Sequence, residues 1–127
     1  MPLDALSSLP SPRVSYPYLV MINSVLPALI AGNAVVIKPS PQTPLAAERF
    51  AHAFHNAGVP KDALQVIHLS PELTTHAVQH NLVDFVAFTG SVSGGRAVDI
   101  AAAEAESFKG VGLEVCFDYY LTCLSTS

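Results

Sequence analysis

Short, mainly apolar runs recur along this chain, and they limit its fold more than any other feature. Residues 64–67 and 85–88 are expected to form strands, and residues 34–37 read Ala-Val-Val-Ile without polar alternation. A run of this kind is typical of a strand that is covered on both faces, as in a parallel sheet. A shorter run at residues 111–113 is expected to form a fourth strand.

Segments with helical periodicity separate these runs. The predicted helices occupy residues 18–31, 44–57, 70–81 and about 95–105. Gly32 and Gly58 are suited to end the first two of them, and Pro27 is expected to kink or shorten the first. Thr43 is predicted to cap the second helix, with Pro44 in its first turn. Strand and helix thus alternate with short connections, which predicts an α/β fold with a doubly wound parallel sheet.

The composition is typical of one globular domain. The chain has 127 residues, of which 50% are hydrophobic and 13% are charged. A surface this apolar is expected to be covered in part by further chain. The net charge of -4, with only 6 Lys and Arg residues, argues against a nucleic-acid partner because no basic face is available to bind phosphates.

No membrane span or metal site is predicted. The apolar segment 18–31 is too short to cross a bilayer. His76 and His80 have a spacing that can bind a metal on one helix face, but no third ligand is apparent, so surface histidines are favoured. Cys116 and Cys123 form no zinc spacing, and we expect reduced thiols in a cytoplasmic protein.

Polar residues follow the predicted strands, where ligands of such sheets bind. These candidate site residues are Lys38, Ser40, Pro41, Thr89, Gly90, Ser91 and Glu114. Ser91 begins a helix, whose unpaired N–H groups favour a phosphate, and Lys38 can bind a ribose or phosphate oxygen. Each residue alone is a weak signal, since a serine there is most often a cap and a lysine most often solvated. The glycine-rich fingerprint of ordinary dinucleotide-binding folds is absent from the sequence.

Two longer motifs resemble the aldehyde dehydrogenase superfamily. The first extends from Leu26 to Ser40 and continues with Gln42-Thr43-Pro44. The second extends from Phe85 to Ser91 and is followed by Gly95 and Arg96. Because several motifs occur in the right order and spacing, the resemblance implies the family's Rossmann-like cofactor-binding domain, in an incomplete form. It also implies oxidation of an aldehyde to a carboxylic acid with NAD or NADP.

The resemblance implies roles for the candidate residues. Lys38 matches a lysine that contacts the adenosine ribose, and Ser40 is a further hydroxyl there. Ser91, after Thr89 and Gly90, matches the serine near the pyrophosphate. Glu114 matches the general base that activates water to hydrolyse the thioester. Pro41 stands where the family often has a glutamate that repels a 2′-phosphate, so strict selectivity for NAD is not expected.

Departures from the family pattern predict a chain that is inactive alone. Val14 and Ser15 replace a tryptophan and the oxyanion asparagine, whose loss elsewhere costs on the order of 10²–10³ in rate. After Glu114 the family's Leu-Gly-Gly-Lys is replaced, and the chain ends before the catalytic cysteine. Cys116 or Cys123 would need a lowered pKa and a suitable position to substitute, and ordinary thiols are favoured.

These matches predict three segments: a loop or disordered leader at residues 1–15, a partial NAD(P)-binding domain at 16–114 and a divergent tail at 115–127. The favoured interpretation is a fragment of an NAD(P)-dependent aldehyde dehydrogenase. The alternatives are a non-catalytic product that associates with full-length homologous subunits, an unstable truncated product, or a related branch such as acylating semialdehyde or phosphate-reducing enzymes.

Overall fold

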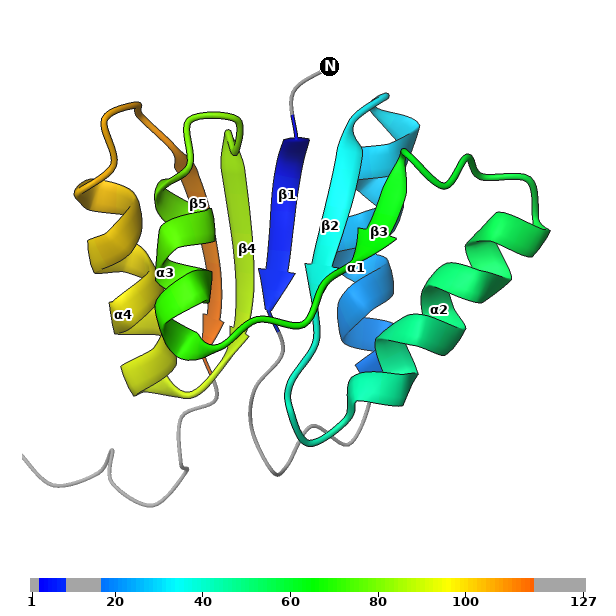
Figure 1. Cartoon of the computed structure of the whole chain (residues 1–127), viewed down its shortest axis with the longest axis horizontal. Helices are drawn as coiled ribbons and strands as arrows, with labels where there is room; N and C mark the ends of the chain where they lie inside the picture. Colours follow the sequence, from blue (N-terminus) through cyan, green and yellow to red (C-terminus); the bar gives the residue numbers. More distant parts are fainter. Residues whose placement is uncertain (1–2, 9–16, 116–127) are drawn as a thin grey trace, which may run out of the picture.

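The fold is a parallel sheet between two layers of helices. The computed structural model describes residues 3–8 and 17–115 (Figure 1). The strands are β1 (Leu3–Ser8), β2 (Ala34–Lys38), β3 (Leu64–Val66), β4 (Phe85–Gly90) and β5 (Gly110–Val115). The helices are α1 (Pro17–Ile30), α2 (Pro44–Asn56), α3 (Pro71–Gln79) and α4 (Val92–Ala103). The strand order is β3-β2-β1-β4-β5, and every pair is parallel.

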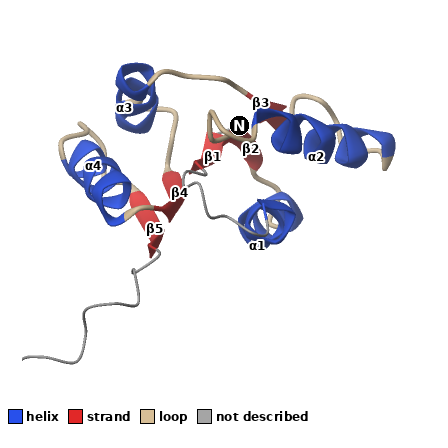
Figure 2. Ribbon diagram, turned by 90° about the horizontal axis from the view of Figure 1, so that it is seen from below, coloured by secondary structure: helices blue, strands red, loops and turns tan. Residues whose placement is uncertain are grey.

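Helices cover both faces of the sheet, which confirms the doubly wound α/β fold. Helices α1 and α2 lie on one face and α3 and α4 on the other (Figures 1 and 2). Successive side chains of β2 divide between two apolar clusters: Val35 and Ile37 pack with α1 and α2, whereas Val36 packs with α3 and α4. This alternation is the period-2 geometry of a strand that is buried on both sides.

The prediction of a loop or disordered leader at residues 1–15 is wrong for residues 3–8. These residues form β1, the central strand, which pairs with β2 on one side and β4 on the other. The segment lacks a β-branched run, so its local sequence favours no strand. Its conformation comes from two neighbouring strands, each of which offers a full row of backbone partners. The sheet therefore begins before residue 16.

The glycines predicted to end helices do so. Gly32 after α1 has a φ of 87° and Gly58 after α2 a φ of 100°, a backbone region that favours glycine. At the first, Gly32 N–H donates to Leu29 O and Asn33 N–H to Ala28 O, both at 3.0 Å, which is the Schellman pattern. Helix α1 continues past Pro27 to Ile30, so the proline does not shorten it.

The serine caps and the threonine cap behave differently. Ser70 and Ser91 accept backbone N–H groups at the starts of α3 and α4 through their side chains. Thr43 occupies the cap position of α2 but accepts no such bond, contrary to prediction. Instead Ala46 N–H donates to the Thr43 carbonyl at 3.2 Å. None of the helices in the described ranges has the length and apolar character needed to cross a membrane.

Candidate functional site

Two cavities lie on opposite faces of the sheet, and both reach the carboxyl ends of the strands. The first, the α3–α4 cleft, has a volume of about 410 Å³. Its lining includes Lys38 from β2, Ser91 before α4, and apolar or small residues of both helices. The structure therefore brings together Lys38 and Ser91, two candidates that are 53 positions apart in the sequence.

Lys38 is buried, and no ion pair joins it to a carboxylate within residues 17–115. Its relative exposure is 9%, and burial lowers the pKa of its ammonium group from the ordinary value through loss of solvation. Within residues 17–115, the ion pair that forms joins His68 to Glu48, at 2.8 Å, and does not involve Lys38. A buried cation of this kind gains most from an anion or from ribose hydroxyls that enter the cleft.

Ser91 and the glycines after it shape the start of α4. Ser91 Oγ accepts Gly94 N–H at 3.1 Å and lies 3.2 Å from Ser93 Oγ. A Cβ at Gly94 would lie 2.7 Å from Cζ of Phe88, a ring that is only 3% exposed. Glycine is therefore required for the first turn of α4 to rest on this ring. That contact places the positive end of the helix beside the cleft.

Ser40 and Pro41 lie in a turn outside both cavities. The turn is closed by Thr43 N–H, which donates to Ser40 O at 3.1 Å. Ser40 is 5% exposed, and its Oγ accepts Gln42 N–H at 3.3 Å. Pro41 is exposed, in a turn position whose φ it already satisfies. The structure thus gives Ser40 a local partner, and it does not place Ser40 or Pro41 in the lining of the α3–α4 cleft.

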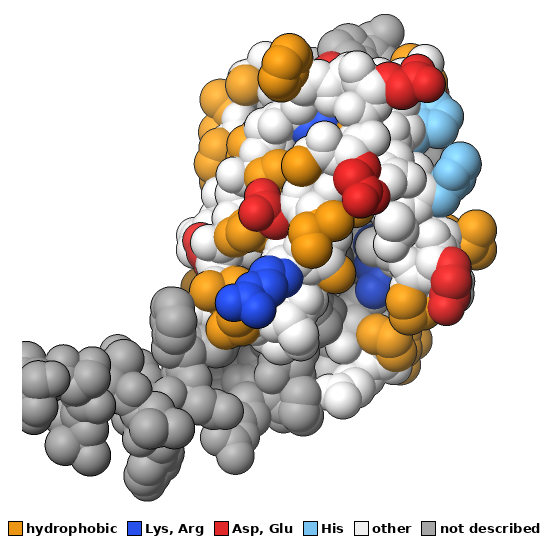
Figure 3. Space-filling model, turned by 90° about the vertical axis from the view of Figure 1, so that its left-hand side faces the viewer, with side chains coloured by type: hydrophobic (Ala, Val, Ile, Leu, Met, Phe, Trp, Pro, Cys, Tyr) orange, Lys and Arg blue, Asp and Glu red, His pale blue; other side chains and the backbone are white. Residues whose placement is uncertain are grey.

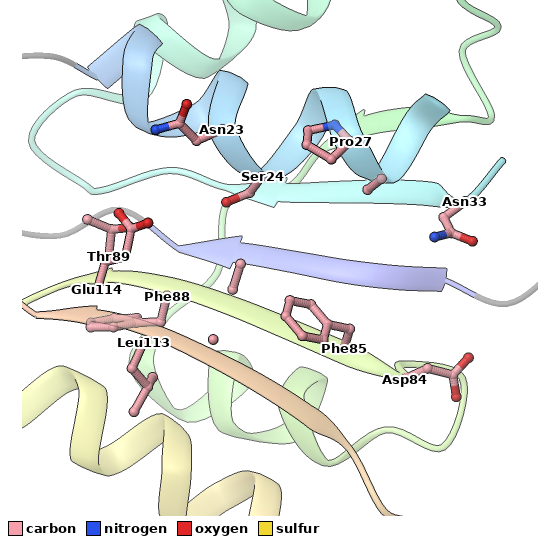
Figure 4. A pocket seen from close by; sticks show the side chains of 13 residues that line it. Asn23, Ser24, Pro27, Asn33, Asp84, Phe85, Phe88, Thr89, Leu113 and Glu114 are labelled. Atoms are coloured by element: carbon pink, nitrogen blue, oxygen red, sulfur yellow. The ribbon is translucent and has the colours of Figure 1, made fainter. Parts of the chain in front are cut away.

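The second cavity, the α1–β5 groove, has a volume of about 790 Å³ and lies between α1 and strands β4 and β5. Thr89 and Glu114 are register partners on β4 and β5 and lie side by side in it (Figure 4). Asn23 and Ser24 of α1 lie across the groove from them. Glu114 is exposed to solvent there.

Thr89 and Ser91 therefore line cavities on opposite faces of the sheet, although only one residue separates them in the sequence. Gly90, the last residue of β4, is buried between them. Because side chains alternate along a strand, Phe88 points into the α3–α4 cluster while Thr89 points into the groove. The candidates form two groups, Lys38 with Ser91 and Thr89 with Glu114, at the same edge of the sheet.

Sequence reasoning missed the walls of both cavities. Thr74, Thr75 and Ala97 line the α3–α4 cleft, but in the sequence they resemble ordinary residues of amphipathic helices. In the groove, Phe85 lies over β5, where Cβ atoms at Gly110 and Gly112 would approach its ring to 2.5 and 3.2 Å. Glycines opposite an aromatic residue in paired strands were the available signal.

The other candidates from the sequence lie away from these cavities or outside the described residues. His76 and His80 are exposed, and His80 Nδ1 accepts Leu82 N–H at 3.2 Å. Residues 3–8 and 17–115 contain no group of three side chains able to hold a metal ion. Val14, Ser15, Cys116 and Cys123 lie outside the described residues.

Comparison with known proteins connects this arrangement to one enzyme family. The family model of the aldehyde dehydrogenase family matches residues 15–116. Betaine aldehyde dehydrogenase of Rhizobium etli is 45% identical over 101 residues, which are 80% of this chain and 20% of that protein. N-succinylglutamate 5-semialdehyde dehydrogenase of Novosphingobium aromaticivorans is 48% identical over 75 residues, 59% of this chain and 16% of that protein. The chain thus spans about a fifth of the length of these relatives.

Solved structures agree with the fold and the family. An NAD-dependent benzaldehyde dehydrogenase from Corynebacterium glutamicum superimposes with a TM-score of 0.77 and 34% identity, over 89% of this chain and 24% of that one. A 3,6-anhydro-L-galactose dehydrogenase in complex with NAP gives a TM-score of 0.77 and 27% identity, over 91% and 24%. With a family match over residues 15–116, the chain belongs to the aldehyde dehydrogenase family.

Proposed function

We propose that this chain is the cofactor-binding part of an NAD(P)-dependent aldehyde dehydrogenase, and that the α3–α4 cleft binds the adenosine end of the dinucleotide. The observation that carries the proposal is the largely buried side chain of Lys38, which lines that cleft together with Ser91 and the start of α4. The lysine supplies a donor for ribose or phosphate oxygens, and the helix start supplies a favourable potential for phosphate.

The α1–β5 groove is proposed as the reaction side of the same site. In the whole enzyme a bound NAD(P) would supply the hydride acceptor on this side of the site. Glu114 takes a proton from water there and so promotes hydrolysis of the acyl intermediate to a carboxylic acid. Thr89 is its neighbour across the β4–β5 pair. Gly90, which ends β4 between the two cavities, has no side chain and would allow a dinucleotide to lie close to the backbone there.

Both NAD and NADP are proposed as ligands. Pro41 carries no carboxylate that would repel a 2′-phosphate, and the positive charge of Lys38 lies in the cleft. Relatives include a D-glyceraldehyde dehydrogenase (NADP(+)) from Picrophilus torridus as well as the NAD-dependent benzaldehyde dehydrogenase. We further propose that residues 115–127 are a divergent tail and that the protein is cytoplasmic, with its two cysteines reduced.

A calorimetric titration of the purified chain with NAD and with NADP tests the cofactor proposal. Saturable binding of both is expected, and Lys38→Ala should weaken each by about 10-fold or more because a charge-assisted bond is lost. Lys61→Ala is the matched control, since Lys61 is an exposed lysine on the opposite side of the sheet beside α2. A folded wild-type chain that binds neither dinucleotide would refute the proposal.

Association with full-length homologous subunits is a second candidate, favoured by the exposed apolar side chains of α1. Leu19 is 60% exposed and Ile30 is 78% exposed, and Phe85 and Leu113 in the groove are 42% and 40% exposed. The face formed by α4 adds further apolar side chains, among acidic ones (Figure 3). Light scattering of the chain mixed with a full-length relative should show a joint species. Two separate, unshifted species would exclude this candidate.

A further inference from the structure

A third cavity, the α2–β3 hollow, lies beside the edge strand β3, where α2 flanks the sheet (Figure 2). Its volume is about 790 Å³. It shares no lining residue with the α3–α4 cleft or the α1–β5 groove. The polar residues that α2 contributes recur at helical spacing, so they share one side of that helix: Glu48, Arg49, His52, His55 and Asn56. Lys61, in the turn that follows α2, completes the polar lining.

The hollow gathers positive charge although the chain is acidic. The chain has six Lys and Arg residues against ten Asp and Glu residues. Two of the six, Arg49 and Lys61, line this one cavity, and within residues 17–115 no ion pair engages either of them. Glu48 supplies the carboxylate of the lining, and its Oε1 already lies 2.8 Å from His68 Nε2. A solvated helix face ordinarily pairs its charges along the helix, whereas these two cations are left available to a ligand.

Two hydrogen bonds orient the histidines of the lining. Asn56 Nδ2 donates to His52 Nδ1 at 3.2 Å, so the proton of the neutral ring lies on the other nitrogen, Nε2. His55 Nε2 donates to Leu64 O at 2.9 Å, which ties α2 to β3 at one side of the hollow. His52 Nε2–H therefore adds a donor to the guanidinium of Arg49, while the acceptor side of the lining is largely engaged.

We infer that the α2–β3 hollow binds a multiply charged oxyanion, through the oxygens of phosphate or carboxylate groups. The planar guanidinium of Arg49 can donate two parallel hydrogen bonds to two oxygens of one such group. Lys61 adds a compact positive charge at the exposed rim, and His52 Nε2–H supplies a further donor. An anion gains from the charges and from the donors together, whereas a cationic ligand is repelled. The site is separate from the proposed cofactor cleft and does not depend on it.

NMR titrations that follow the backbone amides, one with sodium pyrophosphate and one with sodium citrate, test this inference. At low ionic strength, saturable shifts within residues 48–56 and at Lys61 are expected with at least one of the two anions. The anion that saturates at the lower concentration distinguishes phosphate from carboxylate recognition. Shifts confined to Lys38 and residues 91–95 would place the anion in the cofactor cleft alone and overturn the inference. Shifts near α2 that never saturate would overturn it as well.

A charge-matched pair of variants separates this site from the general charge of the chain. Arg49→Gln should weaken the saturating anion about fivefold or more, because a charged donor is lost. Arg49 is exposed, and the same spectra verify that the variant is folded. Arg96→Gln is the control, since Arg96 is exposed on α4 and lines none of the three cavities. Equal weakening by the two substitutions would reflect net charge alone and would overturn the inference.

Discussion

Lys38 places a positive charge where the surrounding strand residues are apolar and buried. Val35, Val36 and Ile37 precede it in β2, and none is more than 9% exposed. Keeping an ammonium group in such a position costs stability unless an anion or polar ligand accompanies it. Binding and stability are therefore opposed at this residue, as is common at functional sites.

The variant Lys38→Met tests this opposition. It keeps most of the side-chain volume and removes the charge, so the unfolding free energy at pH 7 should rise by about 1 kcal/mol. Urea denaturation measures the change, and the same variant should lose dinucleotide affinity. Equal or lower stability of Lys38→Met at pH 7 would contradict the prediction.

The pH dependence follows from the direction of the pKa shift. Burial lowers the pKa of Lys38 in the folded state, so the unfolded chain binds more protons between the folded and unfolded pKa values. The cost of the buried charge is fully present below the folded pKa and is relieved progressively as pH rises from the folded to the unfolded pKa. The stability advantage of Lys38→Met should accordingly shrink at alkaline pH.

A second prediction concerns Gly94 in the first turn of α4. Its substitution by alanine sets a Cβ 2.7 Å from the buried ring of Phe88, and the resulting strain outweighs the better helix propensity of alanine. We expect a loss of about 1 kcal/mol by thermal or urea unfolding. Shortening the ring in Phe88→Leu should reduce the cost of Gly94→Ala, and additive effects in this double-mutant cycle would argue against the contact.

Between elements, one lysine joins two loops at the amino ends of the strands. Lys109 Nζ donates to His80 O at 2.7 Å and to Val83 O at 2.6 Å, and it lies 3.4 Å from Ser107 Oγ. These bonds connect the segment before β4 to the segment before β5, and each involves a charged donor.

Lys109→Met should therefore lower the unfolding free energy by about 2 kcal/mol, because two carbonyl groups lose a charged partner. Lys61→Met is the control and should change stability little, since Lys61 is exposed. Comparable effects of the two substitutions in urea denaturation would show that the bonds of Lys109 contribute nothing specific.

The elements also show how far the sequence predicts the structure. The run at 34–37 was identifiable because burial on both faces demands an unbroken apolar pattern, and every residue of β2 is buried. The strands at 64–67 and 85–88 were identifiable as short, mainly apolar segments between predicted helices, although Gln65 and Phe85 are exposed. Strand β1 was not identifiable from the sequence, because its conformation depends on pairing with β2 and β4 rather than on its own residues. Lys38 and Ser91 were found from their positions after strands, whereas Thr74, Thr75 and Ala97 required the packing of α3 against α4.

At the scale of the molecule, the isolated chain should form no reduced nicotinamide from aldehydes. Among the described residues that line the α1–β5 groove, Glu114 is present and none carries a thiol. A site without a nucleophile would form no covalent acyl intermediate. Absorbance of the reduced cofactor, with aliphatic and aromatic aldehydes, measures the activity. An aldehyde-dependent rise that thiol alkylation abolishes would contradict this expectation.

The central place of β1 has a consequence for the order in which the molecule assembles. Leu6 of β1 pairs with Val86 of β4, about eighty residues later in the chain. During synthesis β1 is followed soon by one of its neighbours, β2. Its other neighbour, β4, is synthesised much later. Closing so long a loop is slow compared with local helix formation. We therefore expect the β1–β4 pairing in the middle of this sheet to form after the outer β2–β3 unit.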